Sequence, residues 1–347
     1  MKILVTGASG FIGSFICSEG VKRGMEVWAG MRRTSSSQYL KDERLKFAEL
    51  DLGDFEKLCG QLRQLKAEMG GQGWDYVVHA AGATKSLTRE GFFKTNTEGT
   101  RNLVEALKAE SMVPQRFVFV SSLSIFGAIR EKAVRKPTAD IPWIYSPIML
   151  TDTPQPNTAY GESKLEAEHY LEGVTDVPWV ILRPTGVYGP REKDYFLMAK
   201  SIKQHVDFAV GYKRQDITFV YVRDVVKAVF LALYKGKNGR KYFLSDGNVY
   251  QSETFSNLIH EELGRPWWIR IKAPIWVLRV VTFFGEYIGR ITGKVTALNN
   301  DKYNILRQRN WRCDIQPAIS ELGYKPEYDL KRGVKETIKW YKDNQWL

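Results

Sequence analysis

Tyr160 and Lys164 are the two residues whose types and spacing best fit acid–base chemistry. They stand four positions apart in the segment Tyr-Gly-Glu-Ser-Lys. Because positions i and i+4 of a helix share one face, we expect the Lys164 ammonium near the Tyr160 phenol, where it favours the ionised phenolate. A tyrosine with a lowered pKa is a usable general acid or base near neutral pH.

A glycine-rich segment near the start of the chain has the spacing of a dinucleotide site. Residues 2–6 form a short apolar, β-branched run that predicts a buried strand. Gly7, Gly10 and Gly13 follow at intervals of three and lead into an expected helix at about residues 9–23. The N-terminal end of that helix attracts a pyrophosphate. We therefore expect this turn to bind a nucleotide cofactor through Gly7, Ser9, Gly10, Phe11, Ile12 and Gly13.

The elements that position these residues alternate between strand-like and helix-like patterns, as in βαβ units with a parallel sheet. Six strands are expected at residues 2–6, 27–31, 45–50, 76–79, 116–121 and 177–183. Helical patterns lie between them, including one at residues 97–110. The predicted fold class is α/β, a Rossmann-type doubly wound parallel sheet with a smaller, discontinuous C-terminal substrate domain.

The length of 347 residues exceeds the usual size of one domain. After residue 183 the pattern loosens, and residues 219–233 return to a strand followed by a helix. We assign residues 1–184 with 217–250 to the cofactor-binding domain. Residues 185–216 with 251–347 are assigned mostly to substrate binding.

Composition excludes several classes of function. The 44% apolar and 26% charged residues are ordinary for a globular protein, and no membrane span is expected. The net charge of +12 comes without an arginine-rich tract or a nucleic-acid-binding motif, so no nucleic acid partner is expected. The cysteines and histidines lack metal-like spacing, so no metal site is expected. With Met1 leading directly into the first strand, we expect a cytoplasmic protein.

Two segments fall outside the alternating pattern. Residues 128–158 hold five prolines and form a long irregular segment just before Tyr160, which is either an active-site cover or a surface excursion. Residues 275–291 form an apolar helix pattern with charges near one face. We expect a core or dimer-packing helix there, and an apolar substrate wall or a membrane-surface contact is the alternative.

Together, the glycine turn and the Tyr-x-x-x-Lys segment resemble the extended branch of the short-chain dehydrogenase/reductase superfamily. The likeness extends from Lys2 to about Asp224. It implies that Ser122 donates to the substrate oxygen, that Tyr160 transfers a proton, and that Lys164 holds the cofactor ribose. It also implies that Asn96 supports the lysine, with a helix cap as the alternative role for this residue.

The resemblance also implies further cofactor contacts. Family members place an acid near the adenine after the third strand, at Asp51 with Leu52, and small residues beside the cofactor after the fourth strand. The remaining expected contacts are Ala80, Ala81, Gly82, Ser121, Tyr160, Lys164, Pro184 and Val187.

The end of the second strand indicates which dinucleotide is preferred. Dinucleotide folds usually carry an acid here that binds the ribose hydroxyls, whereas this chain has Arg32 and Arg33. Arginine binds phosphate through planar, charge-assisted contacts. We therefore favour NADP(H), with NAD(H) as the alternative cofactor; two solvated loop arginines would give the same sequence.

Departures from the family pattern narrow the range of reactions that we expect. Sugar-nucleotide 4,6-dehydratases carry an Asp-Glu pair where this chain has Leu123 and Ser124, and nucleotide-sugar epimerases carry an asparagine where it has Gly186. We expect an NAD(P)-dependent oxidoreductase that interconverts a carbonyl and a secondary alcohol of a small molecule. The alternatives are an NAD-dependent nucleotide-sugar epimerase and a non-catalytic cofactor-sensing protein. The resemblance also implies a homodimer.

Overall fold

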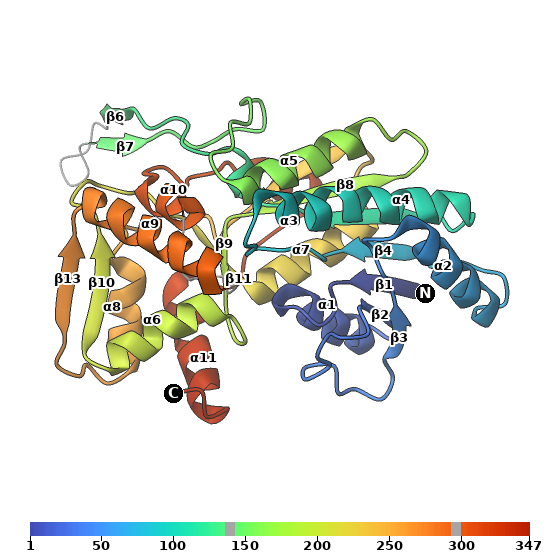
Figure 1. Ribbon diagram of the computed structural model, residues 1–347, viewed down its shortest axis with the longest axis horizontal. Helices are drawn as coiled ribbons and strands as arrows, with labels where there is room; N and C mark the ends of the chain where they lie inside the picture. Colours follow the sequence, from blue (N-terminus) through green and yellow to red (C-terminus); the bar gives the residue numbers. More distant parts are fainter. Residues whose placement is uncertain (136–142, 293–299) are drawn as a thin grey trace.

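A seven-stranded parallel sheet forms the centre of the protein in the computed structural model, which describes residues 1–135, 143–292 and 300–347 (Figure 1). The strand order is β12-β8-β5-β4-β1-β2-β3, the doubly wound arrangement predicted from the sequence. The strands are β1 Lys2–Thr6, β2 Glu26–Met31, β3 Lys46–Glu49, β4 Tyr76–His79, β5 Arg116–Val120, β8 Trp179–Pro184 and β12 Arg240–Leu244.

Helices cover both faces of the sheet, because alternate side chains of each strand point to opposite sides. On one face Val118 packs with helices α1 (Phe11–Lys22) and α7 (Val222–Lys235). On the other face Phe119 packs with three helices, α2 (Phe55–Glu68), α4 (Gly99–Ala109) and α5 (Ala159–Glu172). Each face of the sheet therefore has its own apolar core.

A second group of elements lies beside the carboxyl ends of the sheet strands (Figure 1). It contains α6 Lys193–Lys203, β10 Val206–Val210, α8 Thr254–Glu262, β13 Ile269–Ala273, α9 Ile275–Thr292, α10 Asn300–Arg307 and α11 Leu330–Asp343. The short strands β9 (Gly186–Tyr188) and β11 (Phe219–Tyr221) pair with each other rather than with the sheet. A third core joins α6, α8 and α11 through Ile202, Phe255 and Ile338. The exact domain boundaries assigned from the sequence stay a prediction.

The structure refines several of the predicted elements. All six expected strands are present within one or two residues of their predicted ends, and β12 adds a seventh. The helix expected at residues 97–110 is longer and composite: α3 (Arg89–Phe93) leads through a π-helical turn (Lys94–Glu98) into α4. Short helical turns also occur at Leu123–Ile125 and Ala318–Leu322.

The segment at residues 128–158 is anchored where the structure describes it. Strands β6 (Ala133–Arg135) and β7 (Trp143–Tyr145) form an antiparallel ladder, while two of its five prolines lie in 136–142, outside the described residues. The Asn310 amide donates to the carbonyl oxygens of Arg130 and Ser146 at 3.2 and 2.9 Å. These contacts tie both ends of the ladder to the C-terminal part of the chain.

Candidate active site

The N-terminus of α5 meets the end of β5 and brings Tyr160 close to Ser122. Thr158 caps α5 by accepting a hydrogen bond from the Gly161 amide at 3.0 Å, so the helix begins just before the tyrosine. Ser122 follows β5, and its side chain is hydrogen-bonded to Tyr160 and to the hydroxyl of Ser124, the latter at 3.1 Å. The two residues expected to handle the substrate oxygen therefore lie together.

Burial changes the proton affinity of Tyr160 in the direction opposite to the sequence expectation. Tyr160 is half-buried, and desolvation of its phenol raises the pKa, with the hydrogen bond to Ser122 acting in the other direction. Without a bound cofactor, desolvation is the largest effect on the pKa of Tyr160, and the lowering by Lys164 expected from the sequence stays a prediction for the cofactor-bound enzyme. The protonated form of Tyr160 is the stable one here.

Lys164 is buried one helical turn after Tyr160. Its ammonium donates to the carbonyl oxygen of Val120 at 3.0 Å and lies 4.6 Å from the ring centre of Phe119. Burial lowers the pKa of Lys164 to about 8, and the nearby Glu168 carboxylate opposes this shift. Lys164 can therefore gain or lose its proton close to neutral pH.

Asn96 lies inside the π-helical turn, which excludes the alternative role of a helix cap. Its side-chain oxygen accepts from the Ala83 amide at 2.8 Å, and its amide group donates to Ser163 at 2.9 Å. A Cβ atom at Gly82 would lie 3.0 Å from both the Asn96 oxygen and the Lys164 nitrogen. The two side chains therefore meet at Gly82, and π-helical turns of this kind are frequent at functional sites.

A buried ion pair beneath the site has no counterpart among the sequence predictions. Glu168 accepts from Arg183 at 2.5 to 3.1 Å and from the Ser121 hydroxyl at 2.5 Å. Ser121, expected to contact the cofactor, is thus held in this network. The sequence does indicate that Glu168 lies on the same face of the helix as Tyr160 and Lys164, because the three residues are spaced four apart.

An acidic residue from the second group of elements reaches the first turn of α5. The Asp301 carboxylate of α10 accepts from the backbone amides of Ala159 and Tyr160 at 3.2 and 3.3 Å. A carboxylate at this position complements the positive end of the helix. No sequence pattern signals this contact, because more than 140 residues separate its partners.

The glycine turn has the close backbone approach that a dinucleotide requires. Gly7 has a φ of +69°, and a Cβ atom there would lie 2.6 Å from the Ala81 amide nitrogen. Gly13 packs against the Gly7 carbonyl, where a Cβ atom would lie at 2.2 Å. Gly10 begins α1 and has no capping side chain, so the first-turn amides of Phe11 and Ile12 can bind an anion.

The ends of β2 and β3 carry charged residues of both signs. Arg32 and Arg33 are exposed after β2. Asp51, after β3, is hydrogen-bonded to Lys57 at 2.9 Å, which with a smaller effect from Arg32 holds its pKa below the usual range despite partial burial. Within the described ranges, neither arginine side chain has an ion-pair partner. Basic groups and one neutralised acid therefore line this end of the site.

The other expected contacts lie along the same edge of the sheet. Ala80 and Ala81 follow β4, Pro184 ends β8, and Val187 lies in β9, while Leu52 follows β3 beside Asp51. Among the described residues, no group of three or more His, Cys, Asp or Glu side chains could hold a metal ion. The glycine turn, the small residues and the Tyr160 cluster together fit a nicotinamide dinucleotide.

Comparisons with known proteins agree with this geometry. The family model of the NAD dependent epimerase/dehydratase family matches residues 3–245. An uncharacterized UDP-glucose epimerase of Bacillus subtilis is 27% identical, with 97% of this chain and 97% of that protein covered. The decarboxylating sterol-4-alpha-carboxylate 3-dehydrogenase of Candida albicans is 22% identical, with coverages of 99% and 98%.

A solved structure shows the same fold. It is dTDP-glucose 4,6-dehydratase from Bacillus anthracis in complex with NAD, with a TM-score of 0.75 at 18% identity, covering 99% of this chain and 97% of that one. Because the relatives are enzymes, the alternative of a non-catalytic cofactor-sensing protein is excluded. The chain is an enzyme of the extended short-chain dehydrogenase/reductase type and belongs to the NAD-dependent epimerase/dehydratase family.

Proposed function

We propose that the protein is an NADP(H)-preferring oxidoreductase that interconverts a carbonyl and a secondary alcohol on a small molecule. The observation that carries this proposal is the arrangement of Ser122, Tyr160 and Lys164 at the edge of the sheet that also holds the glycine turn. A hydroxyl donor, a proton donor and a cation thereby converge beside a nucleotide site.

The roles of the side chains follow from their contacts. The bound nicotinamide supplies or accepts the hydride. In the reducing direction, the Ser122 hydroxyl orients the carbonyl oxygen, and Tyr160, protonated in this environment, gives it a proton. Lys164 stabilises the resulting phenolate, and Asn96 holds the backbone beside it.

Two features argue against elimination and epimerisation of sugar nucleotides. Leu123, at the first acid position of the dehydratases, is buried in the apolar core and supplies no proton. At Gly186, where epimerases carry asparagine, a Cβ atom would lie 3.1 Å from the Tyr195 hydroxyl and 3.3 Å from the Phe219 ring. Position 186 therefore has little room for a side chain that would bind a nucleotide phosphate there.

The preference for NADP(H) is proposed from Arg32 and Arg33, whose exposed guanidinium groups can bind a ribose 2′-phosphate. Calorimetric titration with NADPH and NADH tests it, using wild type, Arg32→Ala and a control, Arg44→Ala, which removes an arginine paired with Asp42. Tighter NADPH binding that only Arg32→Ala weakens supports the proposal. Equal affinities, or tighter NADH binding, would contradict it. A screen of ketones and aldehydes with the preferred cofactor then tests the reaction.

An NAD-dependent nucleotide-sugar epimerase is the second candidate, favoured by the relative from Bacillus subtilis. An epimerase regenerates its cofactor in each cycle, so it holds NAD(H) through purification and shows no net change in absorbance at 340 nm. Mass spectrometry of the denatured protein for retained NAD(H), with a UDP-sugar assay, separates the two candidates. The two-domain division, a homodimer and a cytoplasmic location remain part of the proposal.

A further inference from the structure

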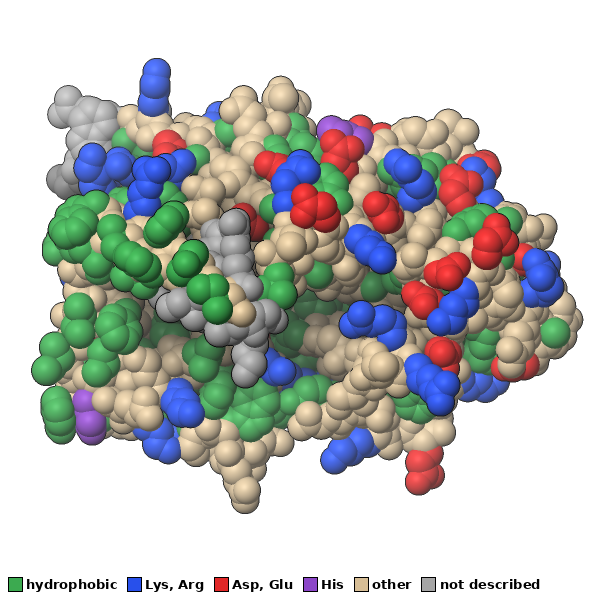
Figure 2. All heavy atoms as spheres, viewed as in Figure 1, with side chains coloured by type: hydrophobic (Ala, Val, Ile, Leu, Met, Phe, Trp, Pro, Cys, Tyr) green, Lys and Arg blue, Asp and Glu red, His purple; other side chains and the backbone are tan. Residues whose placement is uncertain are grey.

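Exposed apolar side chains are concentrated at one end of the molecule, away from the parallel sheet. Of the 20 large hydrophobic side chains exposed in the described residues, 12 belong to β10, β13, α9 and the turns next to the two strands. Figure 2 shows them gathered over these elements. We call this surface the apolar face. Single exposed apolar residues are ordinary, whereas a contiguous group marks an interaction surface.

The two strands of this surface are turned with their apolar side outward. Phe208 and Ile271 pair across β10 and β13 and are 65% and 46% exposed, and Ile269 is 59% exposed. The alternate positions, which face the protein, hold Asp207 and Arg270. This is the reverse of the usual pattern, in which a half-buried strand turns its apolar residues to the core.

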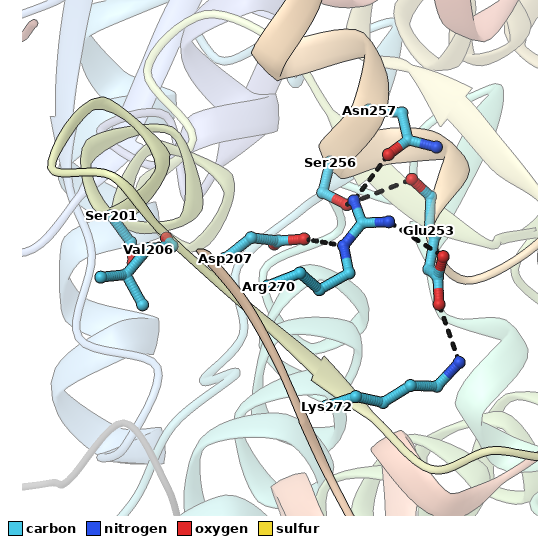
Figure 3. A network of polar contacts seen from close by, with 8 residues as sticks. All are labelled: Ser201, Val206, Asp207, Glu253, Ser256, Asn257, Arg270 and Lys272. Atoms are coloured by element: carbon cyan, nitrogen blue, oxygen red, sulfur yellow. Dashed lines mark hydrogen bonds and ion pairs between the residues drawn. The ribbon is translucent and has the colours of Figure 1, made fainter. Parts of the chain in front are cut away.

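The inward charges pair with each other across the two strands and with residues at the start of α8, as Figure 3 shows. Arg270 donates to Asp207 at 2.6 Å, to Glu253 at 2.9 Å and to Asn257 at 2.6 Å, and Lys272 donates to Glu253 at 2.8 Å. Asp207 is buried and needs this pairing, whereas Arg270, Glu253 and Lys272 are partly exposed, so the inner side of the two strands is polar rather than apolar. The polar contacts on the inner side of the strands therefore hold Phe208 and Ile271 in their outward orientation.

Helix α9 continues the apolar face. It follows β13 directly, and its first residue, Ile275, lies within 3.4 Å of the Cβ position of Gly211 at the end of β10. Trp276, Phe283 and Phe284 are exposed on one helical stripe, while Leu278 on the opposite side is buried. The core alternative of the sequence expectation is thus wrong, because α9 turns its apolar stripe to the surface of the single chain, and the dimer-packing alternative stays a prediction.

Basic residues flank the apolar face. Arg270 and Lys272 of β13 are paired on the inner side of the strand and do not contribute to this flank. Arg279 of α9 and Lys213 after β10 are exposed, and Arg265 before β13 is exposed beside Glu261. An anionic surface would complement them.

We propose that the apolar face docks the enzyme on an anionic phospholipid membrane, with α9 lying in the plane of the interface. None of the helices in the described ranges combines the length and apolar character needed to cross a membrane, so the contact is with one leaflet. Tryptophan and phenylalanine enter the headgroup and acyl boundary, and the flanking cations bind anionic headgroups. The polar network under β10 and β13 keeps the apolar side chains turned to the lipid.

Vesicle co-sedimentation of the full chain tests this proposal. The vesicles contain phosphatidylcholine alone or phosphatidylcholine with phosphatidylglycerol, each at low and high salt. Phe283→Ser with Phe284→Ser removes apolar contacts, and Phe47→Ser on β3, an exposed phenylalanine of the parallel sheet, is the matched control. Arg279→Glu removes a flanking cation, with Lys22→Glu on α1 as its control. Circular dichroism and NADPH titration verify that each variant is folded.

Wild type is expected to sediment with phosphatidylglycerol vesicles at low salt and much less with phosphatidylcholine. The phenylalanine double variant should bind at least tenfold more weakly, and Arg279→Glu about fivefold or more, since each cation near an anionic surface is worth about a factor of five. Both controls should bind like wild type. Wild type that stays in solution with every vesicle overturns the proposal. A wild-type dimer that the phenylalanine double variant dissociates also overturns it, because a second copy would then cover the apolar face.

Discussion

The Glu168 carboxylate and the Arg183 guanidinium form an ion pair beneath the active site, with a shortest distance of 2.5 Å and side-chain exposures of 0% and 3%. Glu168 lies on α5 with Tyr160 and Lys164, and Arg183 lies on β8. The pair therefore joins the helix that carries Tyr160 and Lys164 to the parallel sheet. Its position connects the stability of the fold to the geometry of the site.

Replacing Glu168 by Gln should destabilise the protein strongly, because the variant leaves the buried charge of Arg183 without its counter-ion. A loss of about 3–5 kcal/mol in the free energy of unfolding is expected from urea denaturation. Glu172→Gln is the control, since Glu172 lies one turn further along α5 and pairs with Lys241 at the surface. The free energy of unfolding of Glu172→Gln should fall by less than about 1 kcal/mol. Equal losses in the two variants would contradict the importance assigned to the buried pair.

Replacing Tyr160 by Phe should abolish proton transfer and leave cofactor binding intact. We expect turnover of the carbonyl substrate to fall about 10²–10⁴-fold, the usual contribution of a general acid, with little change in the affinity for NADPH. Tyr170→Phe, on the same helix, removes a hydroxyl that donates to Glu105 at 2.6 Å, and it should retain turnover. Steady-state kinetics and calorimetry check both variants. Undiminished turnover in Tyr160→Phe would sink the assigned mechanism.

Replacing Gly82 by Ala should impair turnover more than stability. The new methyl group would lie 3.0 Å from the Lys164 nitrogen and the Asn96 oxygen, so one of these side chains must move. A misplacement of about 1 Å in a catalytic site can cost about 10²-fold in rate, so the smaller shift at Gly82 should lower turnover by less than that. Gly60→Ala on α2, where no atom lies within 4 Å of the new group, should leave turnover unchanged. An unchanged kcat in Gly82→Ala would show that the function of Lys164 does not depend on the space left by Gly82.

Buried His79 should make the protein less stable in acid. It hydrogen-bonds to Thr6 at 2.7 Å and Thr100 at 3.0 Å, and burial, with a smaller effect from Lys164, lowers its pKa to about 3. Between pH 6.5 and 3 the unfolded chain binds a proton that the folded protein does not. The free energy of unfolding therefore falls as pH falls, by about 1.4 kcal/mol per pH unit from this residue alone.

Urea denaturation between pH 7 and pH 4.5 measures this dependence. His79→Gln should reduce the slope of stability against pH, whereas His169→Gln, which replaces an exposed histidine of α5, should keep the wild-type slope. A slope that is unchanged in His79→Gln would mean that other groups account for the acid sensitivity.

The sequence predicted the elements whose signals are local. The glycine spacing, the strand patterns and the pair Tyr160 and Lys164 each depend on neighbours within a few residues, and the structure places them along one edge of the sheet. The π-helical turn at Lys94–Glu98 was not predicted, because one additional residue in a helical turn leaves no periodic signal.

Features set by tertiary packing could not be predicted from the pattern. The contact of Asp301 with the first turn of α5 joins residues from distant parts of the chain. The raised pKa of Tyr160 comes from burial, which a Tyr-x-x-x-Lys spacing does not report. The outward stripe of α9 has the same apolar periodicity as an inward one, so the sequence alone gave no direction for it.

The reversed polarity of β10 and β13 also determines how these two strands align. If β13 slipped by one residue, Ile269 and Ile271 would turn inward, and Arg270 would leave the buried Asp207 without a counter-ion and the half-buried Glu253 without one of its partners. Only one alignment satisfies these carboxylates. The ion-pair network that supports an exposed apolar surface therefore also acts as a register lock, selecting one strand pairing during folding.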